Sequence, residues 1–224
     1  TLIEAARWGV ISLAELPLLE LPSKAKEQQA WQELQSLDIV DNKYLLTKHG
    51  EKASTLPCHP RFAHMILMAQ SQNQQLLACL LAALLEERDV FKGEQAKFDC
   101  DLLHRLQLVT QSKSEHNGQH KNPLFVRIIQ QASRLAQNLQ LRFSVHSLDL
   151  TKTGVLLAYA YPERVAKTRG NHGDFICVNG KGTLVNEQDA LAAEEFIVIA
   201  QTNQLSHQLG NQLNVKLASQ ISLT

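Results

Sequence analysis

The sequence predicts an α+β protein of several small domains: a winged helix, a helical bundle and a small β-barrel of the oligonucleotide-binding (OB) type. Three observations predict it. A helix, a short hairpin and a second helix precede residue 57, apolar helical runs fill 57–145, and short β-type runs between glycines follow residue 146. A chain of 224 residues, 44% of them apolar, has room for two or three such cores.

Residues 1–22 are expected to connect a preceding domain to the first module. An amphipathic stretch over residues 2–8 ends at Gly9, and Pro17 and Pro22 then interrupt a leucine-rich segment. Prolines at this spacing do not favour a continuous helix, so the segment is interpreted as a connector.

Residues 23–56 follow the pattern of a winged-helix module. Ser23 is a plausible N-cap for a helix over 24–37, two short β-type runs flank the turn at 41–43, and Thr47 can cap a helix through 54. The first helix carries acidic Glu27 and Glu33 as well as lysines, which is not the charge pattern of a recognition helix. We therefore interpret the module as a spacer that does not contact nucleic acid.

Residues 57–145 are predicted to form the helical bundle. Pro60 suits the first position of a helix, where its missing donor is not needed. Further helices are expected over 74–88, near 95–110 and from Asn122–Pro123 to about residue 140, with a flexible polar loop over 111–121. The helix over 74–88 has a wide apolar face that needs neighbours on several sides, formed by Leu76, Leu77, Leu80, Leu81, Leu84 and Leu85.

Residues 146–224 change to a β pattern after a last short helix over 155–161 that Pro162 ends. Five short strands separated by glycine turns fit an OB-type barrel, and the final strand is expected to be truncated. The expected strands are 165–168, 175–178, 183–185, 196–200 and 215–219.

The charges balance overall, with 22 basic and 22 acidic residues, but they are unevenly distributed. Residues 124–183 have a net charge of +5 (eight basic, three acidic), and residues 184–224 one of −3 (one basic, four acidic). A local basic block indicates a surface that faces a polyanion, although a solvated surface is the commoner cause. The four cysteines form no CxxC pair and no apolar run reaches transmembrane length, so a reduced, cytoplasmic protein without a membrane partner is expected.

Motifs for catalysis are missing from this sequence. The chain has no phosphate-binding loop, since Gly180–Lys181 is followed by glycine, and no acidic Mg²⁺ motif, so we predict no catalytic or cofactor-binding residue. Zinc ligation by Cys100 and His104, spaced i, i+4 on a predicted helix, is an alternative to buried cysteines and surface histidines. We favour the latter, for Cys58, His59 and His64 as well, and predict no metal site. The spacing of Ser144, His146 and Asp149 gives no triad geometry.

The basic block also contains aromatic side chains, a combination that suits single-stranded nucleic acid because cations neutralise phosphates and aromatic rings stack on bases. Tyr159, Tyr161 and Phe175 are candidates for stacking, and the tyrosines fit equally well as core residues of the last helix. The predicted nucleic-acid-binding residues are Arg164, Lys167, Arg169 and Lys181, with Arg127 and Arg134.

Four segments together resemble the DEAH/RHA-type helicases, and within them the bacterial HrpB group. Each is modest alone, but all four occur in the family's order over nearly the whole chain, and His59 resembles the HrpB group in particular. The segments are 31–41 (WQELQSLDIVD) with 46–50 (LTKHG), 56–63 (LPCHPRFA), 80–91 (LLAALLEERDVF), and 157–166 (LAYAYPERVA) with 179–182 (NGKG).

The resemblance implies the helicase-associated region of an ATP-dependent RNA helicase whose two RecA-like motor domains precede residue 1. The bundle would be the family's ratchet, ATP and Mg²⁺ would be used by the parent protein, and the partners would be its motor domains and single-stranded RNA or DNA. Arg61 belongs to the family motif, but a salt bridge at its helix start is the preferred role. The competing hypothesis is a protein-interaction scaffold without direct nucleic-acid contact, in which the leucine-rich bundle, through the wide apolar face of the helix over 74–88, or the winged helix docks a partner.

Overall fold

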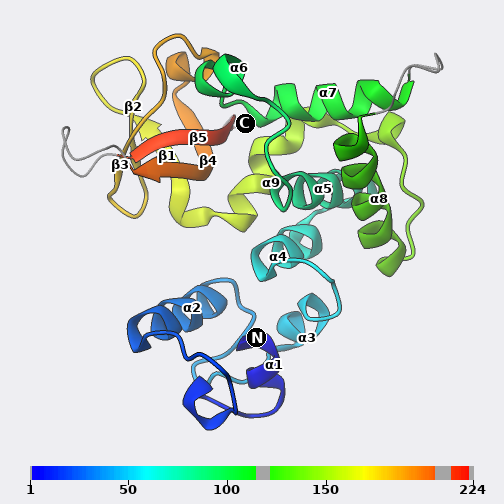
Figure 1. Ribbon diagram of the computed structural model, residues 1–224, viewed down its shortest axis with the longest axis vertical. Helices are drawn as coiled ribbons and strands as arrows, with labels where there is room; N and C mark the ends of the chain where they lie inside the picture. Colours follow the sequence, from blue (N-terminus) through cyan, green and yellow to red (C-terminus); the bar gives the residue numbers. More distant parts are fainter. Residues whose placement is uncertain (1, 115–121, 205–212, 222–224) are drawn as a thin grey trace. The chain divides into compact units, whose positions relative to one another are not determined.

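The computed structural model describes residues 2–114, 122–204 and 213–221, and it confirms a mixed α+β protein with a small five-stranded barrel (Figure 1). The chain forms two compact units, Thr1–Leu67 and Met68–Thr224. Predicted boundaries between a connector, a winged helix, a bundle and a barrel at residues 22, 56 and 145 remain predictions.

The first unit is helical. Its helices are α1 (Leu2–Arg7), the 3₁₀ turn η1 (Leu13–Glu15), α2 (Lys24–Ser36), α3 (Lys48–Ala53) and α4 (Pro60–Met68), which ends at the unit boundary. Both predicted caps are confirmed, because the Ser23 hydroxyl accepts a hydrogen bond from Lys26 N–H and the Thr47 hydroxyl accepts one from Gly50 N–H. Pro60 begins its helix as predicted.

The predicted hairpin between α2 and α3 is reduced to one antiparallel bridge, between Val40 and Leu46. The Asp41 carboxylate shapes its turn by accepting hydrogen bonds from the N–H groups of Lys43 and Leu45 (2.8 and 3.0 Å). Gly50 of α3 packs directly on the segment before the turn, where an added Cβ would lie 1.9 Å from the Ile39 carbonyl oxygen.

Two histidines of this unit contact one another across α3 and α4. His49 Nε2 lies 2.8 Å from His64 Nδ1 and the rings meet edge to face. Burial lowers the pKa of His49, and burial with the neighbouring His49 lowers the pKa of His64 to about 4. Both imidazoles are therefore neutral in the folded protein near pH 7.

Acidification is expected to destabilise the first unit between pH 6.5 and about 4. The unfolded chain protonates these imidazoles near their usual pKa of 6.5, so over this range it binds more protons than the folded unit. Allowing for the half-exposed rings, we expect a loss of about 1–2 kcal/mol. Urea unfolding followed by tryptophan fluorescence measures it, because both tryptophans, Trp8 and Trp31, belong to this unit. Replacing His49 and His64 together by glutamine should flatten the pH dependence; an unchanged slope would contradict this origin.

The second unit is organised around α5 (Gln72–Leu85), which is buried at every position from Leu76 to Leu85. The helices packed against it are α7 (Leu102–Ser114), α8 (Pro123–Asn138) and α9 (Thr153–Ala160). The remaining short elements are α6 (Gly93–Phe98), η2 (Val145–Ser147), η3 (Leu150–Lys152) and η4 (Pro162–Arg164). The predicted loop over 111–121 is helical in α7 as far as Ser114, and residues 115–121 lie outside the described residues.

The single helix predicted near 95–110 is wrong, because α6 and α7 are separated at residues 99–101. This segment crosses to the barrel, where Cys100 N–H donates to the buried Asp189 carboxylate (2.6 Å) and Asp101 forms a parallel bridge with Ala218. Cys100 therefore does not lie on a helix with His104, contrary to the predicted i, i+4 spacing.

The barrel closes in the order β1–β2–β3–β5–β4. All neighbouring strands are antiparallel except the parallel pair β3–β5. The core inside contains Phe175, Ile197 and Ala218, all fully buried. The predicted strands are confirmed with shifted ends: β1 (Val165–Thr168), β2 (Asp174–Cys177), β3 (Gly182–Leu184), β4 (Phe196–Gln204) and β5 (Leu213–Gln220), with the 3₁₀ turn η5 (Ala190–Ala193) before β4.

Candidate nucleic-acid interface

Arg164 and Lys181, from segments 17 residues apart, line one pocket of about 100 Å³ at the barrel. Arg164 ends η4 and Lys181 lies in the turn between β2 and β3. Backbone hydrogen bonds hold the two segments together, from Asn179 N–H to Glu163 O (3.2 Å) and from Val178 N–H to Val165 O (2.9 Å). Two of the predicted cations thus share a site.

The other lining residues of this barrel pocket are polar or apolar, with no carboxylate among them. They are Cys177, Asn179, Thr183, Ile199, Thr202 and Leu213. Burial, with the nearby Glu163 charge, raises the pKa of the Cys177 thiol, and the hydrogen bond from Thr183 and the charges of Arg164 and Lys181 oppose this shift. The thiol is therefore neutral, and the one described carboxylate paired with these cations, Glu163 at 3.4 Å from Arg164 Nε, is not among the lining residues.

Lys167 lies on β1 and Arg169 just after it, and each has an acidic neighbour. The Lys167 ammonium is 3.7 Å from the Glu195 carboxylate and 5.4 Å from the centre of the Phe196 ring, and Arg169 Nε is 3.2 Å from Asp174. Exposed ion pairs of this kind are weak and exchange readily for other anions. These cations are accessible, but they are not part of the barrel pocket.

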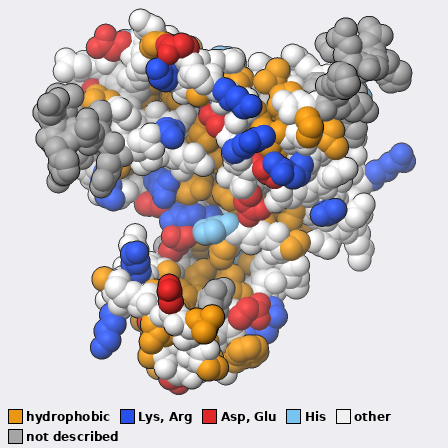
Figure 2. All heavy atoms as spheres, viewed as in Figure 1, with side chains coloured by type: hydrophobic (Ala, Val, Ile, Leu, Met, Phe, Trp, Pro, Cys, Tyr) orange, Lys and Arg blue, Asp and Glu red, His pale blue; other side chains and the backbone are white. Residues whose placement is uncertain are grey.

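Arg127 and Arg134 are exposed on α8 and are not brought to the barrel. In Figure 1, α5 and α9 lie between α8 and the strands of the same unit. Arg127 forms a 2.6 Å ion pair with Glu87, whereas no described carboxylate pairs with Arg134. Figure 2 shows acidic side chains among the basic ones on the visible face of the second unit, so that face carries no continuous basic surface.

The aromatic side chains are less available for stacking than the sequence suggested. Phe175 is fully buried in the barrel core, so its predicted stacking role is wrong. Tyr161 is only 9% exposed and is covered by the Arg164 guanidinium, 4.6 Å from its ring centre. Tyr159 is partly buried on α9. Phe196 of the barrel is also partly exposed, and it lies next to Lys167 in the strand register.

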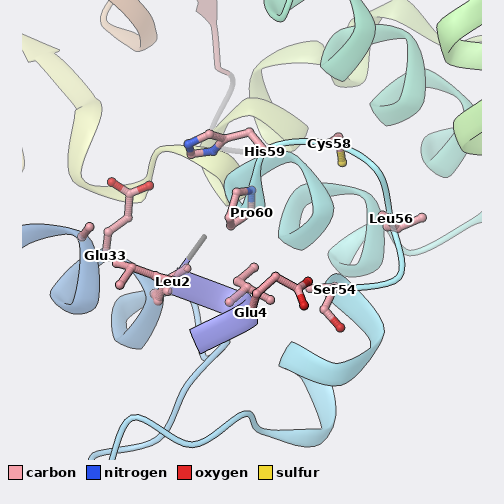
Figure 3. A pocket seen from close by; sticks show the side chains of 12 residues that line it. Leu2, Glu4, Glu33, Ser54, Leu56, Cys58, His59 and Pro60 are labelled. Atoms are coloured by element: carbon pink, nitrogen blue, oxygen red, sulfur yellow. The ribbon is translucent and has the colours of Figure 1, made fainter. Parts of the chain in front are cut away.

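A larger pocket of about 440 Å³ lies within the first unit (Figure 3). Figure 3 shows Leu2 and Glu4 of α1, Glu33 of α2 and His59 of the segment before α4 around it. Its lining includes two carboxylates but no lysine or arginine, and Glu33 is tied to Arg61 Nε at 2.7 Å, the salt bridge expected for Arg61. A negatively charged lining disfavours phosphates, so this pocket is not the candidate site.

Within residues 2–114, 122–204 and 213–221, no group of three or more His, Cys, Asp or Glu side chains could hold a metal ion. His104 Nδ1 lies 2.8 Å from Asp99; burial opposes its protonation, but this contact raises its pKa. Burial and the nearby Asp189 carboxylate raise the pKa of the Cys100 thiol. None of the described helices is long and apolar enough to cross a membrane.

The sequence did not identify Asn179 and Thr183 as pocket residues. An Asn-Gly pair is a turn signal, and it could have placed Asn179 beside Lys181 at a tight turn. The position of Thr183 could not be inferred, because its inward direction depends on the register of β3 against β2.

The comparisons with known proteins lead to one class, the ATP-dependent RNA helicases. No family model matches the chain. A candidate ATP-dependent RNA helicase of Schizosaccharomyces pombe is 23% identical over 94 residues, 42% of this chain and 8% of that protein.

Within that class, the ATP-dependent RNA helicase HrpB of Escherichia coli is 25% identical over 197 residues, 88% of this chain and 21% of HrpB. Two crystal structures of E. coli HrpB, one described as a DExH-box NTPase and one as a DEAH/RHA helicase, share the fold. Their TM-scores are 0.75 and 0.79 at 24% identity, covering 99% and 100% of this chain and 24% and 25% of theirs. The predicted resemblance to the HrpB group is confirmed, and the chain spans about a quarter or less of these relatives.

Proposed function

We propose that this chain is a non-catalytic accessory region of an ATP-dependent RNA helicase of the HrpB type, and that it binds single-stranded nucleic acid for an ATPase motor. The similarity to HrpB over 88% of the chain supports this proposal. The parent protein uses ATP and Mg²⁺, and its RecA-like motor domains are partners of this region.

The barrel is the OB fold of this proposal, and it grips the strand. Its strand order, with antiparallel β1–β2–β3 and a parallel β3–β5 closure, supports that assignment. The barrel cations Lys167, Arg169, Arg164 and Lys181 supply the phosphate contacts, and the partly exposed Phe196 supplies an aromatic face. The single observation that carries the proposal is the clustering of Arg164 and Lys181 in a pocket without a carboxylate.

Residues 23–56 of the first unit are the winged helix of this proposal, and residues 57–145, which include the helices around α5, are the ratchet bundle. Exposed apolar side chains at Trp8, Ile11, Leu19 and Leu21 support a protein contact by the segment around η1. We assign that contact to a motor domain of the parent. The apolar face of α5 no longer supports a scaffold for other proteins, because residues Leu76 to Leu85 are already buried.

Removing two barrel cations should weaken strand binding. The Arg164→Ala, Arg169→Ala double variant is expected to bind a fluorescein-labelled oligouridylate at least about tenfold more weakly than the wild type at low salt. Fluorescence anisotropy over a salt series measures this, and the slope of log affinity against log salt should fall by about one to two.

The charge-matched control is Lys24→Ala with Lys26→Ala, two exposed lysines of α2. This variant should retain the affinity of the wild type. Equal losses in both double variants would show non-specific attraction, and no binding by the wild type at low salt would refute strand binding by this region.

A further inference from the structure

The turn between β2 and β3 forms one rigid wall of the barrel pocket. Gly180 has a φ of +79°, a left-handed conformation that glycine adopts without strain, and its N–H donates to Cys177 O (2.8 Å). The Asn179 side-chain oxygen accepts a hydrogen bond from Lys181 N–H (3.1 Å). This hydrogen bond fixes the amide of Asn179 and leaves its NH₂ group as a donor.

Arg164 forms the facing wall and is held before any ligand arrives. Its Nη1 donates to Ala200 O (2.8 Å), and its guanidinium carbon lies 4.6 Å from the centre of the Tyr161 ring. Together with the Nε contact to Glu163 (3.4 Å), these interactions use fewer than the five N–H donors of a guanidinium. Arg164 therefore keeps donors for an anion at a fixed position.

Thr183 provides an unusual feature at the base of the pocket. The residue is 1% exposed, and among the described residues its buried hydroxyl meets only the Cys177 thiol, whose pKa a hydrogen bond from Thr183 lowers. A thiol is a weak hydrogen-bond partner, so this buried hydroxyl can make a stronger hydrogen bond to an anionic oxygen. A hydroxyl, an amide NH₂, an ammonium and a guanidinium around one small space are all donors.

We propose that the barrel pocket is a phosphate subsite, in which the Thr183 hydroxyl, Lys181 and Arg164 bind the oxygens of one phosphate group. The geometry is suitable because donors surround the space and no lining carboxylate repels an anion. The inference rests on the proposed function in that a nucleic-acid strand supplies the phosphate. The group that the pocket binds is a phosphate. It can be a backbone phosphate of the strand, the terminal phosphate of a strand or inorganic phosphate.

The test uses Thr183→Val in the 224-residue chain, because valine keeps the shape of threonine and removes only the hydroxyl. Since the only described partner of this hydroxyl is the Cys177 thiol, a weak one, thermal stability should change little. Isothermal titration with inorganic phosphate and with 5′-phosphorylated and unphosphorylated oligouridylates should show phosphate affinity reduced about fivefold to tenfold. Lys181→Gln should reduce it about tenfold, whereas Lys216→Gln, an exposed lysine of β5 outside the lining, should have no effect.

The phosphorylated and unphosphorylated oligonucleotides distinguish the possible sources of the bound phosphate. Preference for the phosphorylated strand, lost in Thr183→Val, identifies a strand end, and equal binding of both strands with the same loss identifies a backbone phosphate. Inorganic phosphate binding without strand binding supports the pocket and refutes the proposed function. If Thr183→Val and Lys181→Gln leave strand binding unchanged, the phosphate subsite is refuted but the proposed function is not. If the chain binds neither inorganic phosphate nor a strand, both the subsite and the proposed function are refuted.

Discussion

Replacing Arg105 by methionine is expected to lower the unfolding free energy of the second unit by about 3–5 kcal/mol. Arg105 is 1% exposed, and its Nε and Nη2 each lie 2.8 Å from an Asp89 oxygen. Nη1 donates to Asp101 O (3.0 Å), and the guanidinium lies 4.3 Å from the centre of the Phe91 ring. Methionine fills much of the volume but leaves the Asp89 carboxylate without its partner.

Thermal unfolding followed by circular dichroism measures this loss. Arg134→Met is the matched control, since it removes an exposed arginine of α8 and should change stability by no more than about 0.5 kcal/mol. Asp89→Asn should lower the unfolding free energy much less in the Arg105→Met background than in the wild type. In that background the Asp89 charge that it removes has already lost its partner. Additive losses would show that the pair does not couple.

Replacing Gly154 by alanine is expected to cost about 3 kcal/mol or more. Gly154 lies in the first turn of α9, and a Cβ there would be 1.9 Å from the Gln220 carbonyl oxygen at the end of β5. Since the obstacle is backbone, either α9 or β5 must move, and the contact between the helices and the barrel of the second unit is lost.

Gly170→Ala is the control for this substitution. Gly170 has a φ of +69° but open space around it, so alanine should cost only the strain of a left-handed conformation, about 1–2 kcal/mol. Hydrogen exchange at β5 amides measures the local effect, and protection should fall much further in Gly154→Ala. Equal effects of the two substitutions would show that the close approach of α9 to β5 is not needed.

The features that the sequence predicted well are those with a local cause. Ser23 and Thr47 cap their helices and Pro60 starts one because these effects need only neighbouring backbone groups. The leucine spacing of α5 required neighbours on several sides, and the structure provides them. The glycine-separated strands followed from turn chemistry alone.

The features that the sequence missed have distant causes. The break between α6 and α7 depends on Asp189, which accepts a hydrogen bond from Cys100 N–H across 89 residues of sequence. Arg105 was not singled out, since its partners become neighbours only when that break forms. The pairing of Arg164 with Lys181 in one pocket similarly depends on backbone contacts between η4 and the β2–β3 turn.

The cations of the predicted block consequently separate into groups that composition could not distinguish. Arg164, which also contacts Glu163, shares with Lys181 a pocket that no carboxylate lines, whereas Lys167 and Arg169 are exposed beside acidic side chains and lie outside that pocket. Arg127 and Arg134 lie on α8, away from the strands. We therefore expect strand contact to be concentrated on the barrel.

Hydrogen exchange of the 224-residue chain with and without a single-stranded oligouridylate tests strand binding by the barrel most directly. Added strand should protect amides over β1–β3 and the turns between them, residues 165–184, and leave α8 and the first unit unchanged. Protection confined to α8 or to the first unit, or none at a strand concentration that saturates anisotropy, would contradict the assignment of strand binding to the barrel.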